Sequence, residues 1–371
     1  MTLNQELLLS APVTTAVKCG LIFFLLVNIV PIMAWVERRG MALMQNRLGP
    51  NRIGPLGLLQ SLADAIKFIF KEDRIPGHTK GFYYFMAPFI SVVPAFMGMA
   101  AIPFASSITI GETTIQFQIA PLNVGLLYVL AVASLGVYGI IIGAWASNSK
   151  YALYGGLRSS AQMISYELAM GLSLLGAVAF YGTVDLMEIA KIQGQTFQIG
   201  GMAVPKWGIF MQPVGALIFL VCIFAETNRT PFDLAEGESE IVAGYHLEYG
   251  SMKFALFMMA EYVNMTTASA MMATIFLGGW QLLPGMPQLL HWLGSSGTLE
   301  GVWLEWTRVG LEFTSFITKV LAMMWFFVWV RWTVPRFRYD QLMALGWKVL
   351  LPLSLVNLIA TALIIWAQRS F

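Results

Sequence analysis

Long apolar segments alternate with short polar ones along the whole of this 371-residue chain. Each of the longest apolar segments could cross a bilayer as a helix, which takes about 20 residues. These segments lie near residues 14–36, 82–104, 121–146, 160–181, 210–226, 253–280, 309–331 and 345–367. The pattern predicts an all-α integral membrane protein with eight transmembrane helices, organised as a single transmembrane domain over residues 1–371.

Basic residues collect in alternate connections between these segments. The connections 37–80, 147–159, 227–252 and 332–344 hold most of the arginines and lysines, whereas the other connections hold few. Loops rich in Lys and Arg stay on the cytoplasmic side of a membrane. We therefore expect the four basic connections to face the cytoplasm and both chain termini to face the opposite side.

The first basic connection carries two local patterns. Residues 46–55 (NRLGPNRIGP) are rich in Gly and Pro, which predicts a shaped turn rather than a helix. After it, apolar residues recur at helical spacing, with polar residues on the other face; these apolar residues are Leu58, Leu62, Ile66, Ile69 and Phe70. The spacing predicts an amphipathic helix over 56–72 that lies in the membrane interface. A short helix packed on the spans without lipid contact is the alternative.

Acidic residues collect in the third basic connection, the acidic loop 227–252, and at its borders. They are Glu226, Asp233, Glu236, Glu238, Glu240 and Glu248. If 236–248 is helical, Glu236, Glu240 and Glu248 share one face. Crowded carboxylates raise one another's pKa, which is typical of a site that binds cations or handles protons. A loop that is merely solvated is the alternative.

Ionisable residues also fall within the apolar segments, where each charge costs at least about 2.5 kcal/mol on insertion scales. They are Glu37, Glu167, Glu226, Glu261, Glu312 and Lys319. Carboxylates that face the interior of a transmembrane bundle are typical of proton relays. For Glu37 and Glu226, interfacial charges that reach water are the alternative.

Composition limits the other kinds of chemistry. The chain is 57% hydrophobic and only 11% charged, against about a quarter charged in soluble domains. Its two cysteines, Cys19 and Cys222, lie far apart, and with three histidines they form no metal-ligand or iron–sulfur spacing. We therefore expect no metal site and no redox cofactor of the chain's own. No Ser, His and Asp arrangement of a hydrolase stands out either.

Several motifs resemble those of one membrane subunit of bacterial NADH:quinone oxidoreductase, respiratory complex I, whose mitochondrial counterpart is NADH dehydrogenase subunit one. They are ERR at 37–39, QNRLGPNRIG at 45–54, FKED at 70–73, WASNSKYAL at 145–153, LRSSAQMISYE at 157–167, AETNRTPFDLAEGESE at 225–240, MAEY at 259–262 and PRFRYDQLM at 335–343. The resemblance covers nearly the whole chain in the right order. It implies eight transmembrane helices, the first one long and tilted, with an amphipathic helix on the cytoplasmic side.

The resemblance also implies the roles of particular residues. Quinone, the substrate, would bind in a chamber shared with the soluble arm, walled on this chain by Arg38, Arg39, Arg47, Phe232, Asp233 and Glu236. The family's acidic proton pathway maps onto Glu37, Glu167, Glu226, Glu238, Glu240 and Glu261. We add Lys319 to this pathway because it lies near the middle of the seventh apolar segment. Some family members carry a further Glu in the third or fourth span. Segment 121–146 has no acid here, which puts a relay step at that position in doubt.

Partners follow from the same resemblance. They are the soluble-arm iron–sulfur and quinone-site subunits, the antiporter-like and small membrane subunits, and the lipid bilayer, with no nucleic acid. The implied location is a bacterial inner membrane, with both termini on the periplasmic side. Two alternatives remain. A membrane subunit of an energy-converting hydrogenase would lack quinone, but the preserved NRLGPNRIG and GESE strings argue against it. A secondary transporter would show inverted repeats, which the chain lacks.

Overall fold

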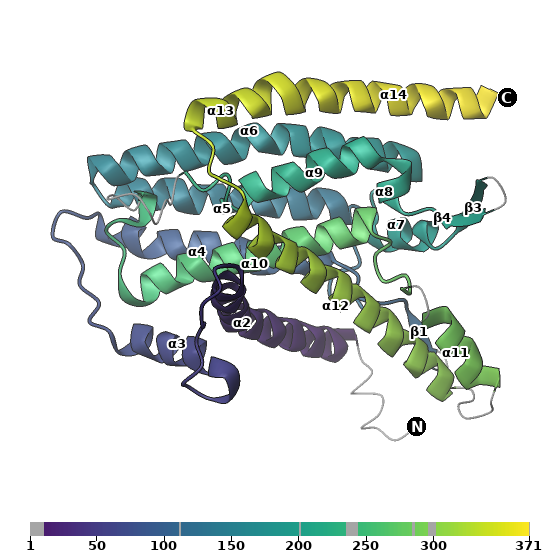
Figure 1. The fold of residues 1–371 in the computed structure, drawn as a ribbon, viewed down its shortest axis with the longest axis horizontal. Coiled ribbons are helices and arrows are strands. Elements are labelled where there is room, and N and C mark those ends of the chain that lie inside the picture. Colours follow the sequence, from purple (N-terminus) through teal and green to yellow (C-terminus); the bar gives the residue numbers. More distant parts are fainter. Residues whose placement is uncertain are drawn as a thin grey trace.

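The computed structural model describes residues 11–110, 113–199, 202–234, 244–283, 286–295 and 302–370, and helices dominate it (Figure 1). One helix covers each of the expected apolar segments. These helices are α2 (Ala11–Met44), α4 (Gly81–Gly98), α5 (Gly125–Ala146), α6 (Lys150–Tyr181), α9 (Pro213–Glu226), α10 (Ser251–Phe276), α12 (Val302–Thr333) and α14 (Leu351–Ser370). The 3₁₀ turn η2 (Met99–Ala101) extends α4.

Six of the described helical segments are long and apolar enough to cross a membrane. They contain α2, α4, α5, α6, α12 and α14. Helix α9 is apolar but has only 14 residues, or about 21 Å of length. Helix α10 has 26 residues but carries Lys253 and Glu261. The fold is therefore that of a helical membrane protein with six clear candidate spans.

The long helices form a layered bundle. Helix α4 packs between α5 and α10, and α6 packs on both α5 and α9. Helix α14 lies along α6 and α9 at one edge, while α2 and α12 pack on α10 at the other edge, where α12 crosses the bundle diagonally (Figure 1). Most of the buried apolar side chains belong to one continuous core between these helices.

The two ends of the bundle differ. We call one of them the basic end. It comprises residues 45–80, 147–149, 227–234, 244–250 and 334–338, and residues 235–243 lie outside the described residues. The short elements there are η1 (Pro55–Gly57), α3 (Gln60–Phe70), η3 (Gly244–His246) and α13 (Tyr339–Ala344), which a π-helical turn (Leu345–Leu350) joins to α14.

At the opposite end, which we call the hairpin end, two small antiparallel hairpins cap the helices (Figure 1). They pair β1 (Ile108–Ile110) with β2 (Thr113–Ile115), and β3 (Thr196–Ile199) with β4 (Met202–Pro205). Helices α7 (Leu186–Gln193), α8 (Gly208–Met211) and α11 (Met286–Ser295) complete this end. The all-α prediction missed these hairpins because strands of three or four residues leave almost no periodic signal.

Helix bounds at the basic end also differ from expectation. Helix α2 continues to Met44, so the residues 37–39 lie inside it, and α6 begins at Lys150, so most of the expected loop 147–159 is helical. With 34 residues, α2 is about 51 Å long, well beyond the roughly 30 Å of a bilayer core. Long helices of this kind can continue into water once their apolar run ends.

The amphipathic helix α3 begins at Gln60, later than expected, because the Gly-rich turn before it occupies residues 55–57 as a 3₁₀ turn. Gly57 has a φ of +75°, and a Cβ there would lie 2.2 Å from the carbonyl oxygen of Pro50. Only glycine fits such a position. The apolar side chains of Leu62, Ile66 and Ile69 are exposed in the chain alone.

Candidate proton-handling site

The turn that follows α9 is fixed by side chains of α6. The Nε2 group of Gln162 donates to the carbonyl oxygens of Ala225 and Phe232, each at 2.9 Å. The side-chain amide of Asn228 donates to the Ser159 hydroxyl at 3.0 Å. These buried bonds give the turn one shape and direct Arg229 into the bundle.

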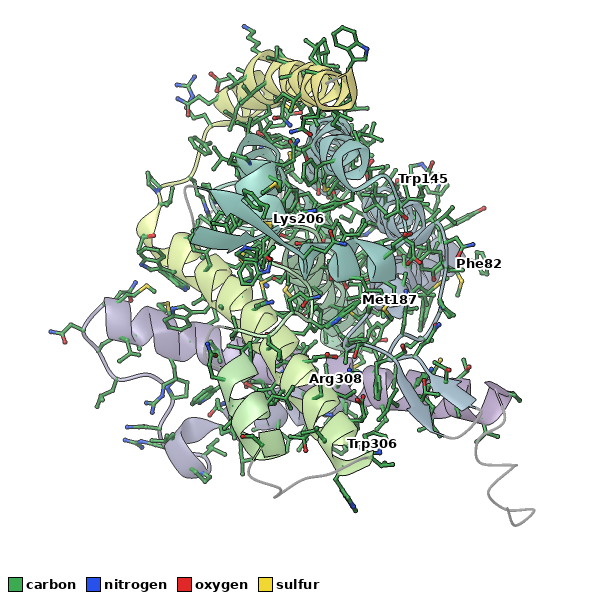
Figure 2. All side chains as sticks on the ribbon, turned by 90° about the vertical axis from the view of Figure 1, so that its right-hand side faces the viewer. Phe82, Trp145, Met187, Lys206, Trp306 and Arg308 are labelled. Atoms are coloured by element: carbon green, nitrogen blue, oxygen red, sulfur yellow. The ribbon has the colours of Figure 1, made fainter. Side chains whose placement is uncertain are left out.

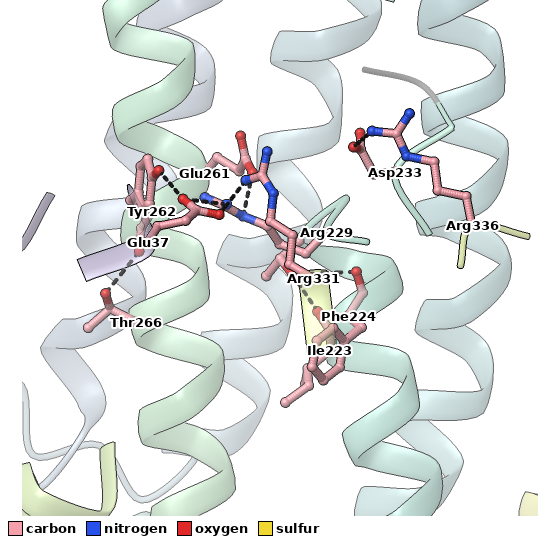
Figure 3. A network of polar contacts seen from close by, with 11 residues as sticks. Glu37, Ile223, Phe224, Arg229, Asp233, Glu261, Tyr262, Thr266, Arg331 and Arg336 are labelled. Carbon is pink, nitrogen blue, oxygen red and sulfur yellow. Dashed lines mark hydrogen bonds and ion pairs between the residues drawn. The ribbon is translucent and has the colours of Figure 1, made fainter. Parts of the chain in front are cut away.

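Arg229 is the centre of a buried ion cluster (Figure 3). Its Nη1 lies 3.1 Å from a carboxylate oxygen of Glu37 on α2, and its Nε pairs with Glu261 on α10. Arg331 on α12 also pairs with Glu37, and the Tyr262 hydroxyl donates to the same carboxylate. These five residues, here called the arginine cluster, join three helices and a turn. Two acids face two arginines, so the formal charges balance.

Burial makes this balance energetically important. Arg229 is 4% exposed and Glu37 is 6% exposed. Burial alone would lower the pKa of Arg229, but the Glu261 and Glu37 carboxylates outweigh it and raise that pKa well above its usual value. Removing one partner of a buried ion pair costs about 3–5 kcal/mol, because the other charge is left uncompensated. Arg229 is therefore held in its charged form at the centre of the arginine cluster.

A small cavity of about 70 Å³ opens beside the arginine cluster. Besides members of the cluster, its walls comprise Asn228, Thr230, Asp233, His246, Phe254 and Met258. Asp233 also pairs with Arg336 at 2.8 Å. Part of the cavity wall is polar, and the cavity can hold several water molecules. It is much smaller than the roughly 300–1,000 Å³ of usual ligand pockets, so it is suited to water rather than to a whole ligand.

Two other carboxyl groups, Glu167 and Glu226, form what we call the carboxylate pair. Glu167 on α6 accepts a hydrogen bond from the Ser134 hydroxyl on α5 at 2.8 Å. Glu226, the last residue of α9, is 9% exposed, and its Oε2 has no hydrogen-bond partner among the described residues. The two groups interact electrostatically. Neither forms an ion pair with any residue that the structure describes, in contrast to the arginine cluster.

The residues expected to wall a quinone chamber fall into two places. Arg38, Arg39 and Arg47 lie at the end of α2, away from the cavity. Arg38 pairs with Asp64 on α3 at 2.6 Å, and Arg39 lies over the Trp35 ring. Asp233 lines the cavity.

The neighbouring Phe232 is buried, with its ring 5.4 Å from that of Tyr166 and 5.5 Å from that of Phe337. The expected site residues Glu236, Glu238 and Glu240 lie outside the described residues.

Lys319 lies apart from both groups of acids. Its Nζ donates to the carbonyl oxygens of Gly279 and Gln281, which follow α10 at the hairpin end. The structure thus brings Glu261 and Asp233 together around one cavity, with Glu37 in the adjoining arginine cluster. It places Glu167 with Glu226 and separates Lys319 from these acids.

Comparison with known proteins identifies the family. The family model described as NADH dehydrogenase matches residues 17–362, which is nearly the whole chain. The chain belongs to the NADH dehydrogenase family. A relative from Bdellovibrio bacteriovorus, named as a subunit of NADH-quinone oxidoreductase, is 45% identical over 369 residues, covering 94% of this chain and 95% of its own length. The predicted resemblance is confirmed.

Two further relatives cover the chain equally well. NADH-quinone oxidoreductase subunit 8 of Rhodothermus marinus is 47% identical over 349 residues, with 93% of this chain and 96% of the relative covered. A relative from Salinibacter ruber, also named as an NADH-quinone oxidoreductase subunit, is 46% identical over 351 residues, with coverage of 95% and 96%. All three names describe subunits of an oxidoreductase complex.

Three residues of the arginine cluster, namely Arg229, Arg331 and Tyr262, were not predicted from the sequence as site residues. The charge pattern presents Arg229 only as a loop residue, and it does not single out Arg331 or Tyr262. A signal did exist, because buried carboxylates require buried cations. Arg331 ends the seventh apolar segment much as Glu37 follows the first, on the same side of the expected membrane. Within the described ranges, no three His, Cys, Asp or Glu side chains gather to hold a metal ion.

Proposed function

We propose that this chain is a membrane subunit of an NADH-quinone oxidoreductase, where it forms part of the quinone chamber and couples quinone reduction to proton translocation. The family match and the names of the relatives support the assignment to such a complex. One observation carries the coupling role. The carboxylate pair has no cationic partner among the described residues, while the nearby arginine cluster is charge-balanced.

The proposed topology has eight spans. The short α9 and the polar α10 complete the six clear candidates, since both lie inside the bundle between apolar helices. The basic end faces the cytoplasm of a bacterial inner membrane, which places both termini on the periplasmic side. Partner subunits supply the soluble arm, the iron–sulfur clusters and the adjoining membrane helices.

In this proposal quinone binds at the basic end, between this chain and the soluble arm. The chain's wall comprises Arg38, Arg39, Arg47, Phe232, Asp233 and Glu236. The small size of the internal cavity supports a chamber that partner subunits complete. Reduction of a quinone to a quinol takes up two electrons and two protons, and any delay in protonation leaves negative charge in the chamber.

That charge acts on two kinds of group. The arginine cluster keeps its charges, because each acid there faces a guanidinium. The carboxylate pair responds instead, because two acids without a cation in a low dielectric cannot both remain ionised. The family pattern adds Glu238 and Glu240 to the carboxylate pair, and these four acids are here called the carboxylate row. Neighbouring membrane subunits receive the change in protonation.

Neutral variants of the carboxylate pair test this function. Glu226→Gln or Glu167→Gln in the assembled complex should lower coupled quinone reduction about a hundredfold, the lower end of the range for loss of an acid–base group. Thermal stability should not fall, since no ion pair is lost. Glu305→Gln is the matched control, because Glu305 is about half exposed and lies at the hairpin end. Quinone reductase rates and proton pumping equal to wild type in both variants would contradict the proposal.

A further inference from the structure

Toward the hairpin end, the bundle contains a buried positive charge that the coupling mechanism above does not use. Lys319 lies near the middle of α12 and is 5% exposed. Its Nζ donates to the carbonyl oxygen of Gly279 at 2.9 Å and to that of Gln281 at 2.7 Å. The ammonium nitrogen lies over the Trp207 ring, 4.7 Å from the centre of that ring. Carbonyl dipoles and an aromatic face both stabilise a cation.

The turn that holds Lys319 is itself fixed to the hairpin end. Gln193 of α7 is fully buried, and its Oε1 accepts hydrogen bonds from the backbone N–H groups of Gly208 and Gly278. The side-chain amide of Gln281 donates to the carbonyl oxygen of Ala190 at 2.8 Å. Elements from three parts of the chain therefore close around the lysine. Figure 2 looks at this end, where α7, marked by Met187, and β4, which Lys206 follows, cover the end of the bundle.

No described carboxylate forms an ion pair with Lys319. The nearest acid on its own helix is Glu312, seven residues or about 10 Å along the axis. That carboxylate accepts a hydrogen bond from the backbone of Ser106 and faces Arg308 at 3.7 Å. The ammonium charge is thus uncompensated at short range, whereas the charges of the arginine cluster cancel.

We infer that Lys319 is the fixed charge of an outer seal, which excludes protons and metal cations that would enter the bundle from the hairpin end. An uncompensated charge among closely packed helices repels other cations, as fixed positive charges do in pores that exclude protons. With an effective dielectric constant near 20, a unit charge about 10 Å away lowers the local cation population roughly tenfold. The carboxylate row is then open from the basic end only.

This inference rests on the proposed membrane orientation and changes the role expected of Lys319. A relay lysine would exchange its proton with neighbouring acids, and its described neighbours are carbonyl oxygens and an indole ring. A seal lysine has to keep its proton and stay in place. Protons can then reach the carboxylate row from the basic end only, which prevents passive proton flow from dissipating the gradient that the complex builds.

The test is passive proton permeability of the assembled complex in liposomes, without NADH or quinone. A trapped pH-sensitive dye reports the decay of an imposed pH difference while valinomycin and potassium clamp the voltage. Lys319→Gln keeps a hydrogen-bond donor and removes the charge, and should increase the protein-dependent leak roughly tenfold. Lys319→Arg keeps the charge and should leak at the wild-type rate. Thr318→Val, on the exposed face of the same helix, is the matched control.

A second variant distinguishes loss of the charge from a folding defect of Lys319→Gln. Ser315 is fully buried, and its hydroxyl donates to the Gln281 carbonyl that Lys319 also contacts. Ser315→Asp keeps the lysine but compensates its charge, so it should leak as Lys319→Gln does. A wild-type leak in either assembled variant would overturn the inference, as would equal leaks in Lys319→Gln and Lys319→Arg. Because the leak needs no substrate, this result is independent of the quinone-reduction test of Glu226→Gln.

Discussion

Arg229 organises the polar interior of this protein. It pairs with Glu37 of α2 and Glu261 of α10, and its guanidinium carbon lies 4.4 Å from the centre of the Tyr262 ring. Each contact comes from a segment far away in sequence. One side chain therefore supplies a cation that two acids of the bundle interior share, and a sequence pattern cannot display such a dependence.

Replacing Arg229 should be strongly destabilising. Arg229→Met leaves Glu37 and Glu261 buried without their shared cation, which should lower the free energy of unfolding by about 3–5 kcal/mol. The measurement is the thermal transition of the assembled complex. The added substitution Glu261→Gln should restore part of the loss, because it removes one uncompensated charge. Exposed Arg74 gives the control Arg74→Met, and an equal effect of both single variants would refute the central position of Arg229.

A second residue-scale prediction concerns Gln162, which fixes the turn after α9. Gln162→Leu leaves the carbonyl oxygens of Ala225 and Phe232 without their donor, at about 1–3 kcal/mol for each unsatisfied group. Hydrogen exchange of the backbone amides of residues 227–234 should become faster. Gln288→Leu, at an exposed position of α11, should leave that exchange unchanged. Unchanged exchange in Gln162→Leu would show that α6 does not fix the turn.

At the scale of elements, α3 and the preceding turn η1 are held to α2 by few polar contacts. Arg38 pairs with Asp64, and the Trp35 indole donates to the carbonyl oxygen of Leu56 at 3.1 Å. Burial raises the pKa of Asp64, but the hydrogen bond and charge of Arg38, together with Lys67, outweigh it and hold that pKa below its usual value. The carboxylate form therefore stabilises the contact between α2 and α3.

The sign of this shift gives a pH dependence. A lowered pKa in the folded state means that the stabilisation is present above the unfolded pKa of about 3.9 and is lost as pH falls through the folded value. We expect less than about 1 kcal/mol, because Arg38 is half exposed. A spin label at Ile69→Cys on α3 should become more mobile below about pH 4. With Asp64→Asn the label should be mobile already at pH 7 and show no such transition; an acid transition that persists would contradict the assignment.

Elements differ in how far sequence predicts them. The length of the apolar segments predicted a helix for each of them, because a segment in a bilayer has to pair its backbone N–H and C=O groups internally, as a helix does. The extensions of α2 to Met44 and of α6 back to Lys150 were missed, since polar residues at a helix end look like loop residues in sequence. The hairpins at the opposite end depend on local pairing between short strands, which apolar patterns do not show.

At the scale of the whole molecule, sequence identified the acids but not their partners. Glu37, Glu167, Glu226 and Glu261 stood out by their depth in apolar segments. Their division into a charge-balanced cluster and an uncompensated pair depends on Arg229 and Arg331, which tertiary packing brings to Glu37. The same packing separates Lys319 from the acids that share its hydrophobic surroundings.

The interior of the bundle therefore contains three electrostatic regions. The arginine cluster lies beside the cavity near the basic end, the carboxylate pair lies between α5, α6 and α9, and Lys319 lies toward the hairpin end. One region holds paired charges, one holds two acids that form no ion pair with a described residue, and one holds a single cation. We propose that quinone reduction changes the protonation of this pair and leaves the arginine cluster ionised.

Redox-induced infrared difference spectroscopy of the assembled complex can distinguish the two groups of acids. Reduction should produce a carbonyl-stretch band of a carboxylic acid that changes its protonation state. The band should be lost in Glu226→Gln and retained in Glu261→Gln, provided that both variants still bind and reduce quinone at a measurable rate. A band that persists in Glu226→Gln and disappears in Glu261→Gln would contradict the proposed coupling, because the proton would then reside in the arginine cluster.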